Sequence, residues 1–175
     1  MRLLSRLPVV LVICLIAIAL PAVSAQAQCG EPAIELSPGS GVPGTEVAVS
    51  GQRFDAGKYV DIYYDETIVA TGRTNSRGNF TILFTVPEGC QGTYEVRAKV
   101  GADGGYNTAY AYFTVKPGLT VSPEKGPVGT NVTVQGRGFA KNEGDIDLMY
   151  YLNDSYETVE RHITANAQGS WETSF

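Results

Sequence analysis

The sequence contains a single His and three Cys in 175 residues, which leaves little material for a zinc site. Basic residues are also scarce, since 13 Lys and Arg stand against 18 Asp and Glu, for a net charge of −5. Because phosphate contacts need a basic surface, this balance argues against nucleic acid as a partner. Glycine, in contrast, is abundant at 20 residues, with ten Tyr and six Phe beside it. Turn-forming glycines and aromatic residues together indicate β-structure with many tight turns.

One apolar run, Val9–Leu20, lies near the N-terminus behind two arginines. It has about 12 residues, fewer than the roughly 20 that span a bilayer. The tripeptides that end at Ala25 and Ala27 both fit the small-x-small pattern of a cleavage site. We interpret residues 1–25 as a secretory signal peptide, cleaved after residue 25 or 27, with an uncleaved membrane anchor as the alternative. The mature protein is then secreted, extracellular or on the cell surface, and the mature part has no membrane span.

The mature chain contains an internal repeat. Residues 37–54 and 122–139 agree at nine of 18 positions at a constant offset of 85, and Asn75–Phe80 aligns with Asn166–Trp171. We therefore expect two homologous domains, at residues 33–117 and 118–175, behind a linker of residues 26–32. The second copy stops at Phe175, the counterpart of Phe84. We expect it to lack its last strands, with further repeats or domains after Phe175.

Seven short segments of the first repeat alternate apolar and polar side chains, as half-buried strands do. They cover residues 33–37, 46–51, 59–65, 67–74, 79–86, 94–100 and 109–115. Seven antiparallel strands, each with one apolar face, need two sheets packed face to face. The prediction is an all-β fold of tandem immunoglobulin-like β-sandwiches, the first complete and the second truncated.

Two local features refine this prediction. Gly92-Thr93-Tyr94 fits a tyrosine corner, in which the Tyr hydroxyl donates to the preceding backbone, and fits a plain core tyrosine equally well. Residues 114–120 run from the last strand of one repeat almost directly into the first strand of the next. We therefore expect a semi-rigid, end-to-end arrangement of the two repeats.

The repeated pattern S-P-x-x-G-x-x-G-T-x-V-x-V-x-G-x-x-F resembles the opening of IPT/TIG-type immunoglobulin-like domains. The N-x-x-G-x-F turn and the V-P-x-G-x-x-G-x-Y segment extend the resemblance across the first repeat, and it covers most of the second. Such domains occur in tandem in secreted and cell-surface proteins of bacteria and archaea. The family motif carries no catalytic residues, so the resemblance implies binding, spacing or adhesion.

The mature chain keeps two cysteines, Cys29 and Cys90, in an oxidising compartment where an even number indicates a disulfide. The expected topology argues against this bond. Cys29 precedes the first strand and Cys90 follows the fifth, at opposite ends of the sandwich, whereas bonded Cα atoms lie within about 7 Å. Both alternatives stay open.

Loss of the signal's two arginines also leaves 11 basic residues against 18 acidic ones, a net charge of −7.

Candidates for catalysis or metal binding are few. The sole histidine, His162, shares a strand with Glu160, and a solvated strand histidine is the favoured interpretation over a catalytic one. Acidic residues gather near Asp61 and near Asp147, without the alternating pattern of a calcium loop. We predict no catalytic residue, no metal and no cofactor.

The outward-facing aromatic residues are the candidate binding site. In an immunoglobulin-type sandwich the third, sixth and seventh strands share a sheet, and its outer face would carry Tyr63, Arg97, Tyr110 and Tyr112. Tyrosine supplies apolar area with a polar tip, which suits a sugar ring or a protein contact. The alternative is cross-strand pairing that only stabilises the sheet surface.

Three functions are consistent with these observations. The first is a non-enzymatic secreted or cell-surface protein whose repeats act as spacer, adhesion or protein-interaction modules. The second is a carbohydrate-binding accessory module of a larger secreted enzyme. The third is an enzyme whose active site lies beyond residue 175. The partner is then a protein or a cell-surface glycan.

Overall fold

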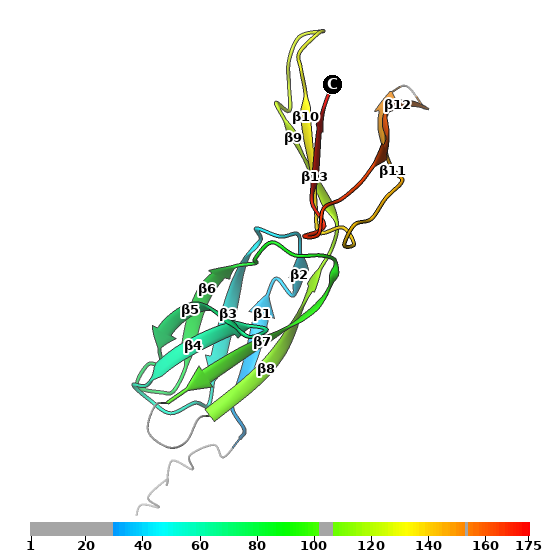
Figure 1. The fold of residues 1–175 in the computed structure, drawn as a ribbon. Helices are drawn as coiled ribbons and strands as arrows, with labels where there is room; N and C mark the ends of the chain where they lie inside the picture. Colours follow the sequence, from blue (N-terminus) through cyan, green and yellow to red (C-terminus); the bar gives the residue numbers. More distant parts are fainter. Residues whose placement is uncertain (1–29, 102–106, 153) are drawn as a thin grey trace, which may run out of the picture.

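The computed structural model describes residues 30–101, 107–152 and 154–175. Every regular element in these ranges is a β-strand (Figure 1), and no helix there has the length and apolar character needed to cross a membrane. The expected signal peptide and Cys29 lie outside the described residues.

The first repeat is a sandwich of a three-stranded sheet, ordered β1-β3-β6, and a five-stranded sheet, ordered β2-β8-β7-β4-β5. Its strands are β1 (Ala33–Ser37), β2 (Ser40–Gly41), β3 (Glu46–Gln52), β4 (Tyr59–Tyr64), β5 (Thr67–Arg73), β6 (Phe80–Thr85), β7 (Gly92–Val100) and β8 (Asn107–Val115). All seven expected strands are present with their ends within two residues, so the immunoglobulin-like sandwich is confirmed.

The seven expected strands pair antiparallel as predicted, and β2 is an additional strand that was not expected. Ser40 pairs with Thr114 of β8 in parallel, because the chain crosses from the three-stranded to the five-stranded sheet directly after β1. The first strand is thus split between the two sheets. A segment of two residues is too short to produce the alternation by which strands are recognised in a sequence.

The core of the first repeat follows the alternation of its strands. Val47 and Val49 of β3 are fully buried against Val60, Ile62 and Phe113, which the five-stranded sheet contributes from β4 and β8. Complete burial of each such side chain stabilises the fold by about 1.5–3 kcal/mol. Tyrosines alternate with the buried residues along β4 and β8. The burial of those residues therefore decides on which face of the five-stranded sheet each tyrosine lies.

The second repeat has one sheet ordered β13-β10-β9 and a separate two-stranded sheet, β11-β12. The strands are β9 (Gly118–Ser122), β10 (Thr133–Arg137), β11 (Ile146–Leu152), β12 (Ser155–Ile163) and β13 (Trp171–Ser174). The β11–β12 hairpin diverges from the other sheet (Figure 1), and the buried core between them consists of Val134, Ala165 and Trp171.

The repeated sequence motifs build the same turn twice. The Asn75 side chain accepts hydrogen bonds from the backbone N–H groups of Arg77 and Asn79, at 2.8 and 3.0 Å. Asn166 does the same for Gln168 and Ser170, at 2.9 and 3.0 Å. This side-chain cap is the reason for the N-x-x-G-x-[FW] pattern, since an Asn oxygen replaces a backbone acceptor in a tight turn.

The repeated V-x-G segment creates space for an aromatic ring. The Phe80 ring packs against the bare Cα of Gly51, and the Trp171 indole packs against Gly136 in the same way, so a Cβ at either glycine would collide with the ring. Each ring also contacts a second aromatic, Phe54 at 5.3 Å and Phe139 at 5.7 Å between centroids. Both glycines are therefore fixed by packing.

Candidate functional site

The candidate binding residues form a row on the outer face of the five-stranded sheet. In the strand register Arg97 of β7 pairs with Tyr63 of β4 on one side and with Tyr110 of β8 on the other. Tyr112 lies two residues further along β8 and pairs with Glu95. The four residues expected on one face are thus neighbours across three adjacent strands.

Arg97 is held at the centre of this row by several contacts. Its guanidinium lies over the Tyr63 ring, 4.8 Å from the centroid, within the range of a cation–π interaction. The two terminal nitrogens lie 3.5 Å from the Glu95 carboxylate and 3.6 Å from that of Glu66. Lys99 also approaches the Tyr63 ring, at 5.8 Å. Tyr63 is therefore largely covered and positions Arg97.

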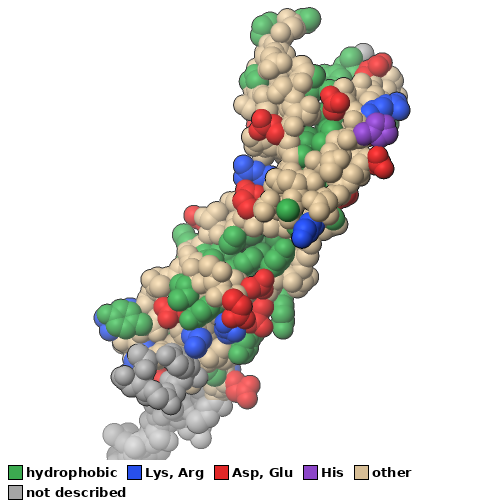
Figure 2. Space-filling model, viewed as in Figure 1, with side chains coloured by type: hydrophobic (Ala, Val, Ile, Leu, Met, Phe, Trp, Pro, Cys, Tyr) green, Lys and Arg blue, Asp and Glu red, His purple; other side chains and the backbone are tan. Residues whose placement is uncertain are grey.

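Tyr110 and Tyr112 are the exposed members of the set, with 55% and 64% of their surface accessible. On the face of the first repeat visible in Figure 2, hydrophobic side chains lie among acidic and basic ones. Tyr110 and Tyr112 are thus available to a partner, whereas Tyr63 is occupied within the molecule.

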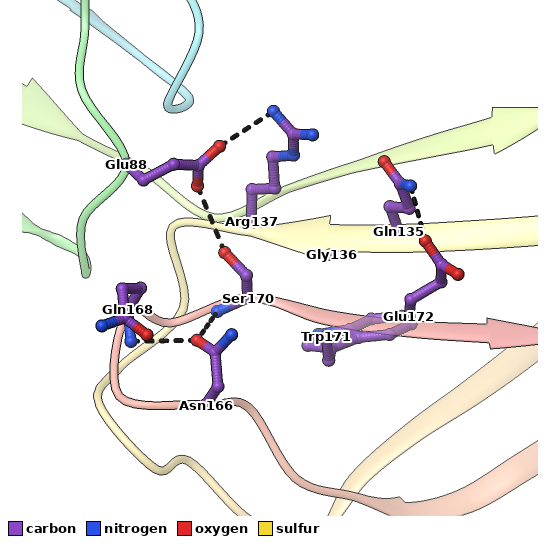
Figure 3. A pocket seen from close by; sticks show the side chains of 9 residues that line it. All are labelled: Glu88, Gln135, Gly136, Arg137, Asn166, Gln168, Ser170, Trp171 and Glu172. Carbon is purple, nitrogen blue, oxygen red and sulfur yellow. Dashed lines mark hydrogen bonds and ion pairs between the residues drawn. The ribbon is translucent and has the colours of Figure 1, made fainter.

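A second cluster, which the sequence analysis did not identify, joins the two repeats. Glu88, in the loop between β6 and β7, forms an ion pair with Arg137 of the second repeat at 3.0 Å. The same carboxylate accepts a hydrogen bond from the Ser170 hydroxyl at 3.3 Å (Figure 3). Gln135 and Glu172 continue this surface and bond to each other at 2.6 Å. They line a hollow of about 390 Å³ beside the ion pair.

Backbone contacts complete this joint. The N–H of Gln91 donates to the carbonyl of Phe139 at 3.2 Å, and the Cys90 thiol donates to the carbonyl of Ala167 at 3.5 Å. A hydrogen bond between two backbones fixes their separation and direction more strictly than contact between flexible surface side chains. The joint therefore combines the exposed ion pair of Glu88 and Arg137 with a backbone hydrogen bond, which forms only when the two repeats lie close together.

Gly138 shows how close this approach is. It has φ of +71°, and a Cβ there would lie 2.6 Å from the carbonyl oxygen of Lys116 and 3.0 Å from Cδ of Pro43. Arg53 occupies the equivalent position of the first repeat with a similar φ of +67° but carries a long side chain. The glycine is thus required by the joint as well as by the backbone turn. This difference within an otherwise repeated motif is the signal that sequence reasoning missed.

The tyrosine corner is confirmed. The Tyr94 hydroxyl donates to the carbonyl of Cys90 at 2.8 Å, and its ring stacks on Tyr64 with centroids 5.0 Å apart. Burial raises the pKa of Tyr94, with further contributions from Cys90 and Asp65. Burial raises the pKa of Tyr64 as well, helped by Tyr94 and Asp65. The corner anchors the Glu88–Gln91 loop that carries the joint.

A groove of about 430 Å³ separates the two sheets of the second repeat, with Val134, Leu148, Tyr150 and Phe175 among its lining residues. Tyr150 and Phe175 are 52% and 47% exposed, whereas their counterparts in the first repeat, Tyr64 and Phe84, are 7% and 4% exposed.

The remaining candidates lack partners for chemistry. His162 is exposed on β12 as expected, and its Nδ1 lies 3.0 Å from the Asp145 carboxylate, which raises the histidine pKa. Among the described residues, no three His, Cys, Asp or Glu side chains are grouped to hold a metal ion. Cys90 is a free thiol within the described part of the chain, and the Cys29–Cys90 disulfide stays a prediction because Cys29 lies outside it.

No protein-family model matches the chain, and a search of curated proteins found no match. Among solved structures, it is similar to the D0-D1 domain of intimin, at 14% identity and a TM-score of 0.34, over 82% of each chain. It is also similar to trypsin-activated α2-macroglobulin from Escherichia coli, at 16% identity and a TM-score of 0.36. That match covers 83% of this chain and 13% of the other.

Proposed function

We propose that the chain is part of a non-enzymatic secreted or cell-surface protein of the IPT/TIG type, whose repeats act as a spacer that carries interaction surfaces. The contact that carries this proposal is the joint between Glu88 and Arg137, at 3.0 Å. Together with the close approach at Gly138, it supports a fixed end-to-end arrangement. A spacer needs such joints because freely moving modules would not hold a binding face at a defined distance from their anchor.

The two repeats support this role in different ways. The first buries a continuous core and leaves Tyr110 and Tyr112 exposed on its outer sheet. The second contributes Arg137, Gly138 and Ser170 to the joint. The signal-like N-terminus and the acidic composition agree with an extracellular location. Adhesion through the exposed sheet face is then the specific activity.

Small-angle scattering and secretion assays test this proposal. The scattering profile of the chain should match a single elongated arrangement of the two repeats. A Gly138→Arg variant, in which the joint cannot close, should give a broader distribution of maximum dimensions. Expression with the intact N-terminus should deliver an exported protein that begins at residue 26 or 28, as read by mass spectrometry. A chain that stays inside the cell, or modules that tumble freely in the unsubstituted protein, would contradict the proposal.

A further inference from the structure

The exposed tyrosines of the first repeat lie on one straight strand. Tyr110 and Tyr112 both belong to β8, point to the same face, and are separated by the roughly 6.7 Å of two strand residues. Their exposed fractions are 55% and 64%, and β8 is an edge strand at these positions because its pairing with β2 covers only Thr114 and Val115. Two exposed aromatic rings therefore lie next to each other on one face of β8.

Three acidic and two basic side chains lie near one another on this face, so its basic groups have carboxylates beside them. Arg97 lies between the carboxylates of Glu95 and Glu66, at 3.5 and 3.6 Å. Lys99 pairs across the strands with Asp61 in the register of β4 and β7. A charged ligand would have to compete with these internal pairs. The face is thus suited to a ligand without net charge.

Each exposed ring has a hydrogen-bonding group beside it. In the strand register Tyr110 is the partner of Arg97 and Tyr112 is the partner of Glu95. The guanidinium is a donor and the carboxylate an acceptor, and the two groups also pair with each other at 3.5 Å. A sugar ring presents an apolar C–H face for stacking and hydroxyl groups at its rim that both donate and accept. Aromatic stacking beside one donor and one acceptor matches that chemistry.

We propose that the outer face of the five-stranded sheet binds a neutral polysaccharide through Tyr110 and Tyr112, with Arg97 and Glu95 contacting its hydroxyl groups. The proposal rests on the proposed extracellular function and names the class of its partner. Tyr63 takes no part in stacking, because Arg97 and Lys99 cover its ring; it positions Arg97. A protein partner is less well matched, since protein hot spots usually fill a recessed pocket, and electrostatic steering needs uncompensated charge.

Binding to microcrystalline cellulose and to chitin beads tests this inference, because both are neutral and present flat chains. The unsubstituted chain is compared with Tyr110→Ala, Tyr112→Ala and the double variant in depletion isotherms at low and at 1 M salt. Tyr156→Ala is the matched control, since Tyr156 is 70% exposed on β12 of the second repeat. Tyr110→Phe keeps the stacking ring. Near-ultraviolet circular dichroism and the urea midpoint establish that each variant is folded.

We expect the chain to bind at least one of the two polysaccharides in a manner insensitive to salt. Loss of each ring should raise Kd by up to about tenfold, the range of one aromatic contact, while Tyr156→Ala and Tyr110→Phe bind as the unsubstituted chain does. No retention on either polysaccharide, retention that survives the double substitution, or capture of a protein alone at this face would overturn the inference. Because the joint is measured separately by scattering, a rigid but non-binding chain would reject the polysaccharide and leave the spacer proposal standing.

Discussion

Gly138 faces the backbone carbonyl of Lys116 so closely that a Cβ would lie 2.6 Å from the oxygen. Lys116 lies in the connection between the repeats, just before Gly118, which pairs with Arg137. The first repeat itself approaches Gly138 through Pro43, whose Cδ would lie 3.0 Å from that Cβ. The short connection between the two repeats would by itself allow them to bend relative to each other. The approach of Pro43 to Gly138, together with the ion pair between Glu88 and Arg137, limits this bending.

Gly138→Ala should destabilise the second repeat and loosen the joint. Gly57 is the matched control, because its φ of +70° is within a degree of that of Gly138 while nothing lies within 4 Å of its Cβ position. Gly57→Ala should lower the free energy of unfolding by about 1–2 kcal/mol, because alanine is sterically strained in the left-handed conformation. Gly138→Ala should cost about 1–3 kcal/mol more, because a Cβ is forced into packed atoms. Urea unfolding of both variants measures the difference. Equal losses of stability would mean that packing at the joint does not restrict the side chain at position 138.

Trp171→Phe should leave stability unchanged within about 1 kcal/mol or raise it. The indole Nε1 is buried without a hydrogen-bond partner, and Phe80 fills the equivalent site of the first repeat above Gly51. A buried unsatisfied donor costs about 1–3 kcal/mol, which offsets the smaller apolar area of Phe. The reciprocal Phe80→Trp should destabilise by about 1–3 kcal/mol through overpacking. Unfolding followed by circular dichroism tests both, and a large loss in Trp171→Phe would contradict this interpretation.

Stability should fall as the pH rises above about 10. The pKa values of Tyr64 and Tyr94 are raised above 10.0 by burial, so the unfolded chain loses these protons first. Their contribution is complete below pH 10 and is lost as the pH approaches the folded-state values. Thermal unfolding between pH 7 and 11 should show this decline, and the Tyr64→Phe variant should show a shallower one. An identical slope in that variant would exclude Tyr64 as the cause.

The pKa of His162 should lie above 6.5 because the Asp145 carboxylate accepts a hydrogen bond from its ring, with a smaller contribution from Asp147. Titration of the imidazole carbon-bound proton signals by NMR measures it directly. In Asp145→Asn the value should move down toward 6.5. If the substitution leaves the titration unchanged, the hydrogen bond does not persist in solution.

Much of the fold could be predicted because the determining signals are local. Alternation located the seven strands of the first repeat, and the outward positions of Tyr63, Arg97, Tyr110 and Tyr112 followed from it. The covering of Tyr63 by Arg97 depends on side-chain rotamers that alternation does not specify. The strand β2 was missed because two residues carry no periodicity.

The joint was not predicted for a different reason. Glu88 and Arg137 are 49 residues apart, and an exposed acid and an exposed base carry no mark of pairing in a sequence. The substitution of Gly138 for the Arg53 of the first repeat was a usable signal, since a repeat that replaces a large residue by glycine indicates a close approach. Its partner atoms, on Lys116 and Pro43, required the structure.

Residual dipolar couplings of the isotope-labelled chain test the central claim, that the contacts around Glu88 and Gly138 hold the two repeats in one orientation, most directly. Couplings from the first repeat and from the second are fitted separately to one alignment tensor each. The joint predicts tensors of equal magnitude and orientation in the unsubstituted chain, and a smaller tensor for the second repeat in Gly138→Arg. Tensors that already differ in the unsubstituted chain would show independently moving repeats and contradict the account.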